Sequence, residues 1–169
     1  MQRIAKFHKV SETQFEKDWV DTFGENGDDI HAVYESIRLP KRATAGSAGY
    51  DFYAPVNIVL APGETIKIPT GIRVEMENNW VLKCYPRSGL GFKYRLQLNN
   101  TVGIIDSDYF YSDNEGHMFA KITNDSNENK TVEIKAGSGF MQGIFVEYGI
   151  TVDDDVTDVR NGGFGSTTK

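Results

Sequence analysis

The chain has 169 residues, enough for one domain with a hydrophobic core, and its 39% apolar and 25% charged residues are ordinary for a globular protein. A formal net charge of −6 argues against binding to nucleic acid through a basic face, since neutralisation of phosphates dominates such binding. No apolar run approaches membrane-spanning length, no signal-peptide pattern is present, and the single cysteine excludes an internal disulfide. We therefore expect a cytoplasmic protein with neither a membrane nor a nucleic-acid partner.

One convincing helix is predicted, close to the N-terminus. Ser11 opens a capping box of the form Ser-x-x-Gln, and Gly24 is suited to end the helix. Between them, Phe15, Trp19 and Phe23 recur at the spacing of one helix face. We predict that this aromatic stripe packs against the same chain or a neighbour rather than binding a cofactor.

Beyond this helix, short apolar runs recur roughly every ten residues and are separated by turns. The runs are interpreted as strands, beginning with an alternating segment over 33–37, whereas 86–91 is interpreted as a loop. The pattern is typical of a sandwich or barrel. We predict an all-β fold in a single domain, 1–169, with an N-terminal extension (1–32), a β core (33–152), and a linker with a C-terminal flap (153–169).

The stretch Asn99–Tyr109 reads as two short extended arms around a tight turn. Gly103 lets the backbone approach another molecule, so main-chain N–H and C=O groups can be offered to a flat polar ring. Beyond the arms, Asp106 can take a proton from water and Tyr109 can stack on or wall off a sugar. The same residue pattern also fits the alternative interpretation, an ordinary strand–turn–strand that carries an acid on the protein surface.

Other segments carry groups suited to phosphates. Arg87, Ser88 and Gly89 can contact phosphate oxygens, and Asp51, after a small-residue turn, can serve a hydrated magnesium ion. The glycine-rich tail (160–169) is either a frayed terminus or a flexible flap, with amides and an arginine for phosphate and a phenylalanine to cover a ring. Together these parts predict a nucleotide site.

Five segments, in order and with matching spacing, resemble the motifs of the trimeric deoxyuridine triphosphatase (dUTPase) family. The resemblance covers about residues 33–169. The five segments are Ala48–Ala54, Pro86–Gly91, Asn100–Tyr109, Gly137–Val146 and Arg160–Thr167.

The resemblance implies a distorted jelly-roll-like subunit, a homotrimer and the hydrolysis of dUTP to dUMP and pyrophosphate, with Mg²⁺ as cofactor. Each active site would be shared by three subunits. One subunit would supply the first, second and fourth motifs, another the hairpin, and the third its tail.

The resemblance also implies roles for individual residues. Asp106 would activate the water that attacks the α-phosphorus, and Tyr109 would exclude ribose. Asp51 would contact magnesium through water. The remaining implied contacts are Asn100, Gly103 and Ile105 with uracil; Arg87, Ser88, Gly89 and Gln142 with the phosphates; Arg160 with the γ-phosphate; and Phe164, stacked on uracil, with Gly165 and Ser166 in the flap.

The chain departs from the family pattern at a few positions. Residues 110–117 lengthen the exit of the hairpin, and Ser138 and Gly139 replace an acid and a base. The three histidines, His8, His31 and His117, receive no role in the site.

Two alternatives to dUTP hydrolysis remain open. One is a regulatory module on the same fold, which would bind a protein partner through the N-terminal helix or the 110–118 loop. The other is a relative of dCTP deaminase, against which the hairpin acid and the tail argue.

Overall fold

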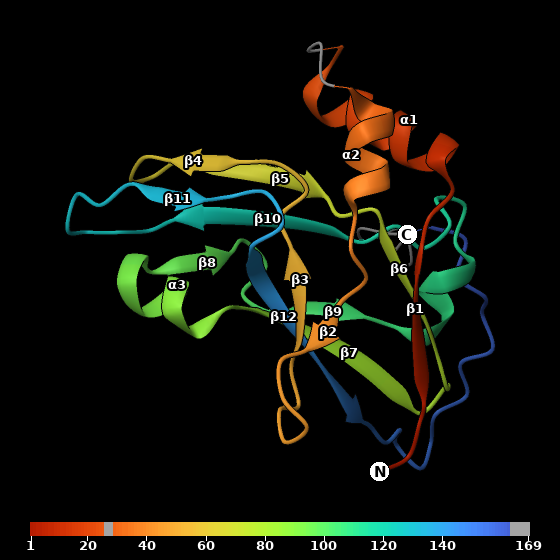
Figure 1. The fold of residues 1–169 in the computed structure, drawn as a ribbon. Helices are drawn as coiled ribbons and strands as arrows, with labels where there is room; N and C mark the ends of the chain where they lie inside the picture. Colours follow the sequence, from red (N-terminus) through yellow and green to blue (C-terminus); the bar gives the residue numbers. More distant parts are fainter. Residues whose placement is uncertain (26–28, 163–169) are drawn as a thin grey trace.

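Antiparallel strands form most of the regular secondary structure in this computed structural model, which describes residues 1–25 and 29–162 (Figure 1). The largest sheet has five strands in the order β2-β3-β12-β7-β9. Its strands are β2 (Lys41–Arg42), β3 (Tyr50–Tyr53), β12 (Gly139–Glu147), β7 (Trp80–Pro86) and β9 (Gly103–Ile105).

Three smaller sheets complete the β structure. One has three strands in the order β5-β10-β8, and the other two are the pairs β11-β4 and β1-β6. Their strands are β1 (Ala5–Lys9), β4 (Ile58–Leu60), β5 (Thr65–Pro69), β6 (Ile72–Met76), β8 (Leu96–Leu98), β10 (Phe119–Asn124) and β11 (Val132–Ile134).

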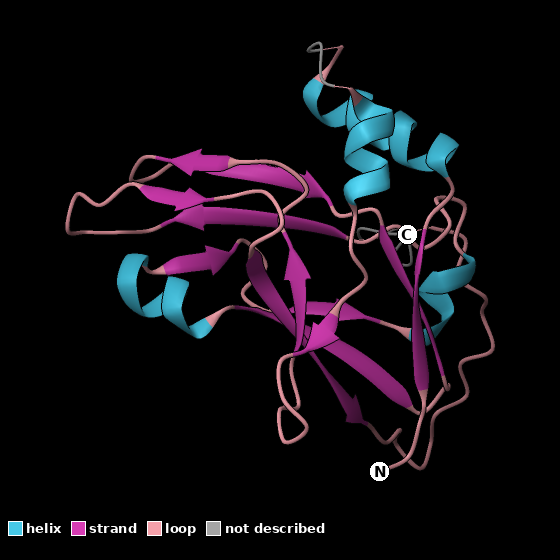
Figure 2. Ribbon diagram, viewed as in Figure 1, coloured by secondary structure: helices cyan, strands magenta, loops and turns pink. Residues whose placement is uncertain are grey.

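The predicted fold class is confirmed. In the part of the chain that the structure describes, three short α-helices lie around the sheets and every strand pair is antiparallel (Figure 2). Among the described strands no barrel closes. The hydrophobic core includes residues of the β sheets and of the N-terminal helix in one cluster, with Phe52, Phe140, Ile68, Trp19 and Phe15 among its buried members.

The N-terminal helix α1 (Glu12–Phe23) begins and ends where its caps predict. The hydroxyl of Ser11 accepts a hydrogen bond from the N–H of Gln14, and Gly24 follows with φ 72°. Phe15 and Trp19 are buried at 0% and 1% exposure, so the aromatic stripe is a packing face within the chain. Only half of the capping box forms, because the N–H of Ser11 donates to Glu115 and the amide of Gln14 donates to Asp18.

The prediction of a strand over 33–37 is wrong. The chain forms helix α2 (Ile30–Ser36), capped by Asp29, whose side chain accepts a hydrogen bond from the N–H of Ala32. Alternation at 33, 35 and 37 also fits a helix whose apolar positions 30, 33, 34 and 37 share one face, and these four side chains pack against the core.

The prediction of a loop over 86–91 is partly wrong, because Ser88–Tyr94 forms helix α3. Gly89 and Gly91 disfavour a helix by local propensity. The helix is short, lies at the edge of the structure and buries none of its residues (Figure 1). Leu90 and Tyr94 are nevertheless partly buried and pack against the core, so tertiary contacts rather than local preference decide the conformation of this segment.

We predict that the N-terminal helix contributes directly to the stability of the β core. Trp19→Ala removes a fully buried side chain and is expected to cost about 3–5 kcal/mol of unfolding free energy. Urea unfolding at a fixed protein concentration measures this loss. Lys17→Ala, at an exposed position of the same helix, is the matched control, and equal unfolding midpoints for the two variants would contradict the prediction.

Candidate active site

A cavity of about 600 Å³ lies beside β9 and is the main candidate site. Six of the predicted residues line it, namely Asn100, Gly103, Ile105, Asp106, Tyr109 and Arg160. The apolar part of the wall includes Leu98, Met118, Phe119, Ala120 and Met141.

The predicted hairpin differs from the observed arrangement. Its arms do not pair with each other among the described strands, because β8 pairs with β10 while β9 pairs with β7. A turn with Thr101 at φ 66° carries the chain from one sheet to the other. The register of each arm is therefore set by its own sheet.

This arrangement leaves β9 at the end of the five-stranded sheet. One side of its backbone is paired with β7, and no other described strand pairs with the opposite side. Edge N–H and C=O groups beside a cavity can hydrogen-bond a flat polar ring in the way that they would bond another strand.

Gly103 is closely packed in this pair. A Cβ atom at this position would lie 3.1 Å from the Cβ of Cys84, the residue opposite in the β7–β9 register. Burial raises the pKa of the Cys84 thiol to about 12, so this side chain is a core residue rather than a nucleophile.

Asp106 and Asp108 both bind the tail arginine. Nη2 of Arg160 lies 2.6 Å from Oδ2 of Asp106, and Nε lies 2.9 Å from Oδ1 of Asp108. The Asp106 side chain is 47% exposed, so solvent reaches the carboxylate despite this ion pair. The predicted contact of Arg160 with a γ-phosphate stays a prediction.

Tyr109 lies one helical turn after Asp106, in the 3-10 helix Ser107–Tyr111. It is 7% exposed, and burial raises the pKa of its phenol. The hydroxyl donates a hydrogen bond to the carbonyl of His117 at 2.7 Å and accepts one from Nδ2 of Asn114 at 2.8 Å. The phenol is thus neutral and held by the segment that follows it.

A second cluster of predicted residues forms across the strands β3, β12 and β7. Asp51 and Gln142 are register partners, and Nε of Arg87 lies 3.3 Å from Oδ1 of Asp51. Gln142 Nε2 donates to the carbonyl of Pro86 at 3.4 Å. Gly139 leaves the space that Arg87 fills, since a Cβ there would lie 2.9 Å from its Nη1.

The two clusters are separate in this chain. Of the described residues that line the cavity, none belongs to the second cluster. Ser88 and Gly89 lie exposed in the first turn of α3. The predicted tail residues Phe164, Gly165 and Ser166 lie outside the described residues.

Sequence reasoning missed Asn114 as a partner of Tyr109. It gave no role to His117, whose side chain is fully buried and hydrogen-bonded to Asp18 of α1. The only available signal was the departure from the family pattern over 110–117, which marks the segment as unusual without indicating what it contacts.

Neither a metal centre nor a membrane helix is found among the described residues. Within residues 1–25 and 29–162, no group of three or more His, Cys, Asp or Glu side chains is placed to hold a metal ion. No helix in the part of the chain that the structure describes combines the length and apolarity needed to cross a membrane.

Comparison with known proteins identifies the family. A family model described as dUTPase matches residues 35–168. The deoxyuridine 5'-triphosphate nucleotidohydrolase of Lactococcus lactis is 43% identical over 134 residues, covering 78% of this chain and 88% of the relative. The enzyme of the same name from Escherichia coli is 38% identical over 141 residues, covering 79% and 89%.

Solved structures agree with these matches. The crystal structure of dUTPase from Streptococcus mutans is 32% identical, with a TM-score of 0.63 over 88% of this chain and 98% of that chain. A mutant dUTPase from phage phi11 of S. aureus, described with a structural Mg(II) ion, has a TM-score of 0.64 over 92% of this chain and 98% of that chain. At 19% identity it supports the fold alone. On the family match and the sequence identities, this chain belongs to the dUTPase family.

Proposed function

We propose that the protein hydrolyses dUTP to dUMP and pyrophosphate. The observation that carries this proposal is the placement of Asp106 at the end of edge strand β9, with its carboxylate half exposed beside a cavity that Tyr109 also lines. The curated relatives at 38–43% identity carry the name of that activity.

Recognition of the base is assigned to the free edge of β9. A uracil ring presents donors and acceptors in its plane, and the backbone of Gly103–Ile105 can pair with them as a further strand would. Asn100, at the turn before β9, supplies an amide. A fixed backbone close to the ring leaves little space for a methyl group, which would exclude thymine.

Asp106 is the general base. Its carboxylate accepts a proton from a water molecule, the water oxygen forms a bond to the α-phosphorus, and the bond from that phosphorus to the bridging oxygen breaks, releasing pyrophosphate. Arg160 pairs with Asp106 of the same chain in this structure, so this ion pair must break before the tail arginine can contact the phosphate oxygens of a shared site.

The second cluster is suited to the phosphates. Arg87 supplies a guanidinium that is 46% exposed, while Gln142 lies beside it across the sheet. Asp51 can hold one hydrated magnesium ion, because Mg²⁺ takes one or two carboxylates together with substrate phosphates rather than a cage of protein ligands. When bound, magnesium supplies positive charge against the triphosphate.

The separation of the two clusters supports a site shared between subunits. A triphosphate whose base lies on β9 of one subunit would meet Arg87 and Gln142 of another subunit in a homotrimer. The flap residues Phe164, Gly165 and Ser166 would come from the tail of the third. This assembly follows from the family resemblance and remains a proposal for this chain.

The regulatory alternative relies on the N-terminal helix and the 110–118 loop as binding surfaces. In this structure Ser11 and Asp18 of the helix region bind Glu115 and His117 of the loop. These contacts favour an internal role for both segments. A dCTP deaminase would release ammonia from dCTP, and a comparison of substrates distinguishes it.

We predict that wild-type protein with magnesium releases pyrophosphate from dUTP and not from dTTP, dCTP or UTP. Asp106→Asn is expected to lower kcat for dUTP by about 10²–10⁴-fold, because the amide cannot accept the proton from water. Asp108→Asn is the matched control, since it removes an equivalent partner of Arg160 from the same segment. A wild type without dUTP turnover, or an Asp106→Asn variant with full turnover, would contradict the mechanism.

We also predict that two inactive variants complement each other. In a trimer assembled at random from equal amounts of Asp106→Asn and Arg87→Ala chains, about a quarter of the sites would combine an intact Asp106 with an intact Arg87 from different subunits. Co-refolded mixtures should therefore regain about a quarter of wild-type activity. If each site is built within one subunit, the mixture stays inactive. Each variant refolded alone is the control.

A further inference from the structure

The orientation of Tyr109 is set by the segment that follows it rather than by the cavity. Its hydroxyl is engaged by the carbonyl of His117 and by the amide of Asn114, while its ring lines the cavity. Because the hydroxyl is held by protein groups, the ring offers an apolar surface to whatever occupies the cavity.

Asn114 is itself oriented. Its Oδ1 accepts a hydrogen bond from the N–H of Gly116 at 3.2 Å, which directs Nδ2 toward the phenol. Gly116 has φ +70°, and a Cβ there would lie 2.6 Å from the carbonyl oxygen of Tyr109. The segment therefore passes directly against the backbone of the tyrosine, at a distance that only glycine allows.

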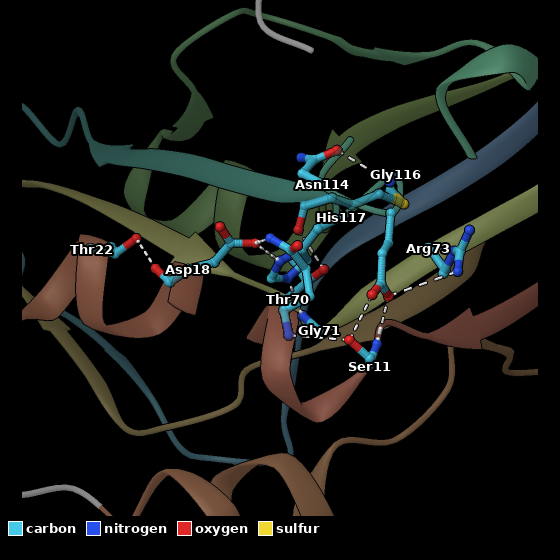
Figure 3. Close-up of polar contacts among 12 residues, drawn as sticks. Ser11, Asp18, Thr22, Thr70, Gly71, Arg73, Asn114, Gly116 and His117 are labelled. Carbon is cyan, nitrogen blue, oxygen red and sulfur yellow. Dashed lines mark hydrogen bonds and ion pairs between the residues drawn. The ribbon is translucent and has the colours of Figure 1, made fainter. Parts of the chain in front are cut away.

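The other partner, His117, is fixed by its imidazole. Nε2 accepts a hydrogen bond from the N–H of Gly71 at 2.8 Å, and a backbone N–H can only donate. The proton of the ring therefore lies on Nδ1, which donates to Oδ2 of Asp18 at 2.5 Å. The side chain is 0% exposed, so no solvent competes for either bond (Figure 3).

Asp18 is a carboxylate supplied by helix α1. Burial alone would raise its pKa, but hydrogen bonds from His117 and Gln14 outweigh burial and hold the pKa below its usual value. Its side chain is 12% exposed. The helix that precedes the family match thus makes a direct contact with His117, whose carbonyl is the partner of Tyr109.

A second attachment joins the same two segments. Glu115 accepts hydrogen bonds from the N–H of Ser11 at 2.7 Å and from its hydroxyl at 2.6 Å, and Arg73 lies 3.8 Å from the same carboxylate. These bonds hold the pKa of Glu115 below its usual value against the opposite effect of burial. The segment is therefore fixed on both sides of Gly116 (Figure 3).

We propose that Asp18, acting through His117, and Asn114 are positioning residues that hold the ring of Tyr109 where it rejects a ribose 2′-hydroxyl. We refer to Asp18, Asn114 and His117 as the tyrosine brace. This inference rests on the proposed function, in which Tyr109 adjoins the sugar. It assigns sugar selectivity partly to α1, a helix outside the residues that the family model matches.

The test measures binding rather than turnover. Dissociation constants of dUDP and UDP, which lack the pyrophosphate leaving group, are determined by calorimetry for the full chain with magnesium. Wild type should prefer dUDP, so the dissociation constant of UDP divided by that of dUDP should be well above one. Asp18→Ala and Asn114→Asp should each reduce this ratio about tenfold. Asp18→Asn keeps an acceptor for His117 and should restore most of the preference. Asp21→Ala, at an exposed position of α1, is the matched control.

The ratio of the two dissociation constants distinguishes a loss of Tyr109 positioning from a general loss of folded protein. A variant that merely loses folded protein binds both ligands less in the same proportion, so its ratio does not change. An unchanged ratio in Asn114→Asp and Asp18→Ala, or in Asn114→Asp alone if Asp18→Ala does not fold, would overturn the inference. Equal affinity of wild type for the two ligands would overturn it as well. Neither result depends on pyrophosphate release, whose absence would contradict the proposed function separately.

Discussion

The antiparallel pairing of β7 with β12 on one side and β9 on the other is the constraint on which the candidate site depends. On the β12 side it places Gln142 opposite Tyr85 and next to Asp51, so the residues proposed to bind phosphate come together at the end of β7. On the β9 side it fixes Gly103 against Cys84 and leaves one edge of β9 next to the cavity. A shift of one residue in either register would turn the alternating side chains to the opposite face.

Charge at the site is balanced within the chain. Arg160 binds Asp106 and Asp108, and Arg87 binds Asp51, so each predicted functional acid already has a cation. A triphosphate bound here would compete with these carboxylates for the same guanidinium groups. The cost of such binding would therefore include the loss of these ion pairs, and the gain would come from stronger, bidentate contacts of arginine with phosphate.

Much of the fold follows from local patterns. Alternation predicts the strands of the β core, and Ser11 and Gly24 mark the ends of α1 because capping is a local effect. Prediction fails where tertiary position decides, as in α2 and α3. The motif order identifies the residue types at the site, but periodicity cannot show that the two arms around Thr101 belong to different sheets. Periodicity also cannot show that Asp18 and His117, which lie 99 positions apart in the sequence, are in contact.

The contacts of the 110–117 segment with α1 have a consequence for how such proteins diverge. An imidazole buried without Asp18 would be an uncompensated polar group in the interior, and such a group costs about 1–3 kcal/mol. Without Ser11, the partly exposed Glu115 carboxylate would lose two hydrogen bonds and keep only Arg73 nearby. Helix and segment are therefore expected to be gained or lost together among relatives. A boundary drawn at the start of the family match would cut through a cooperative unit.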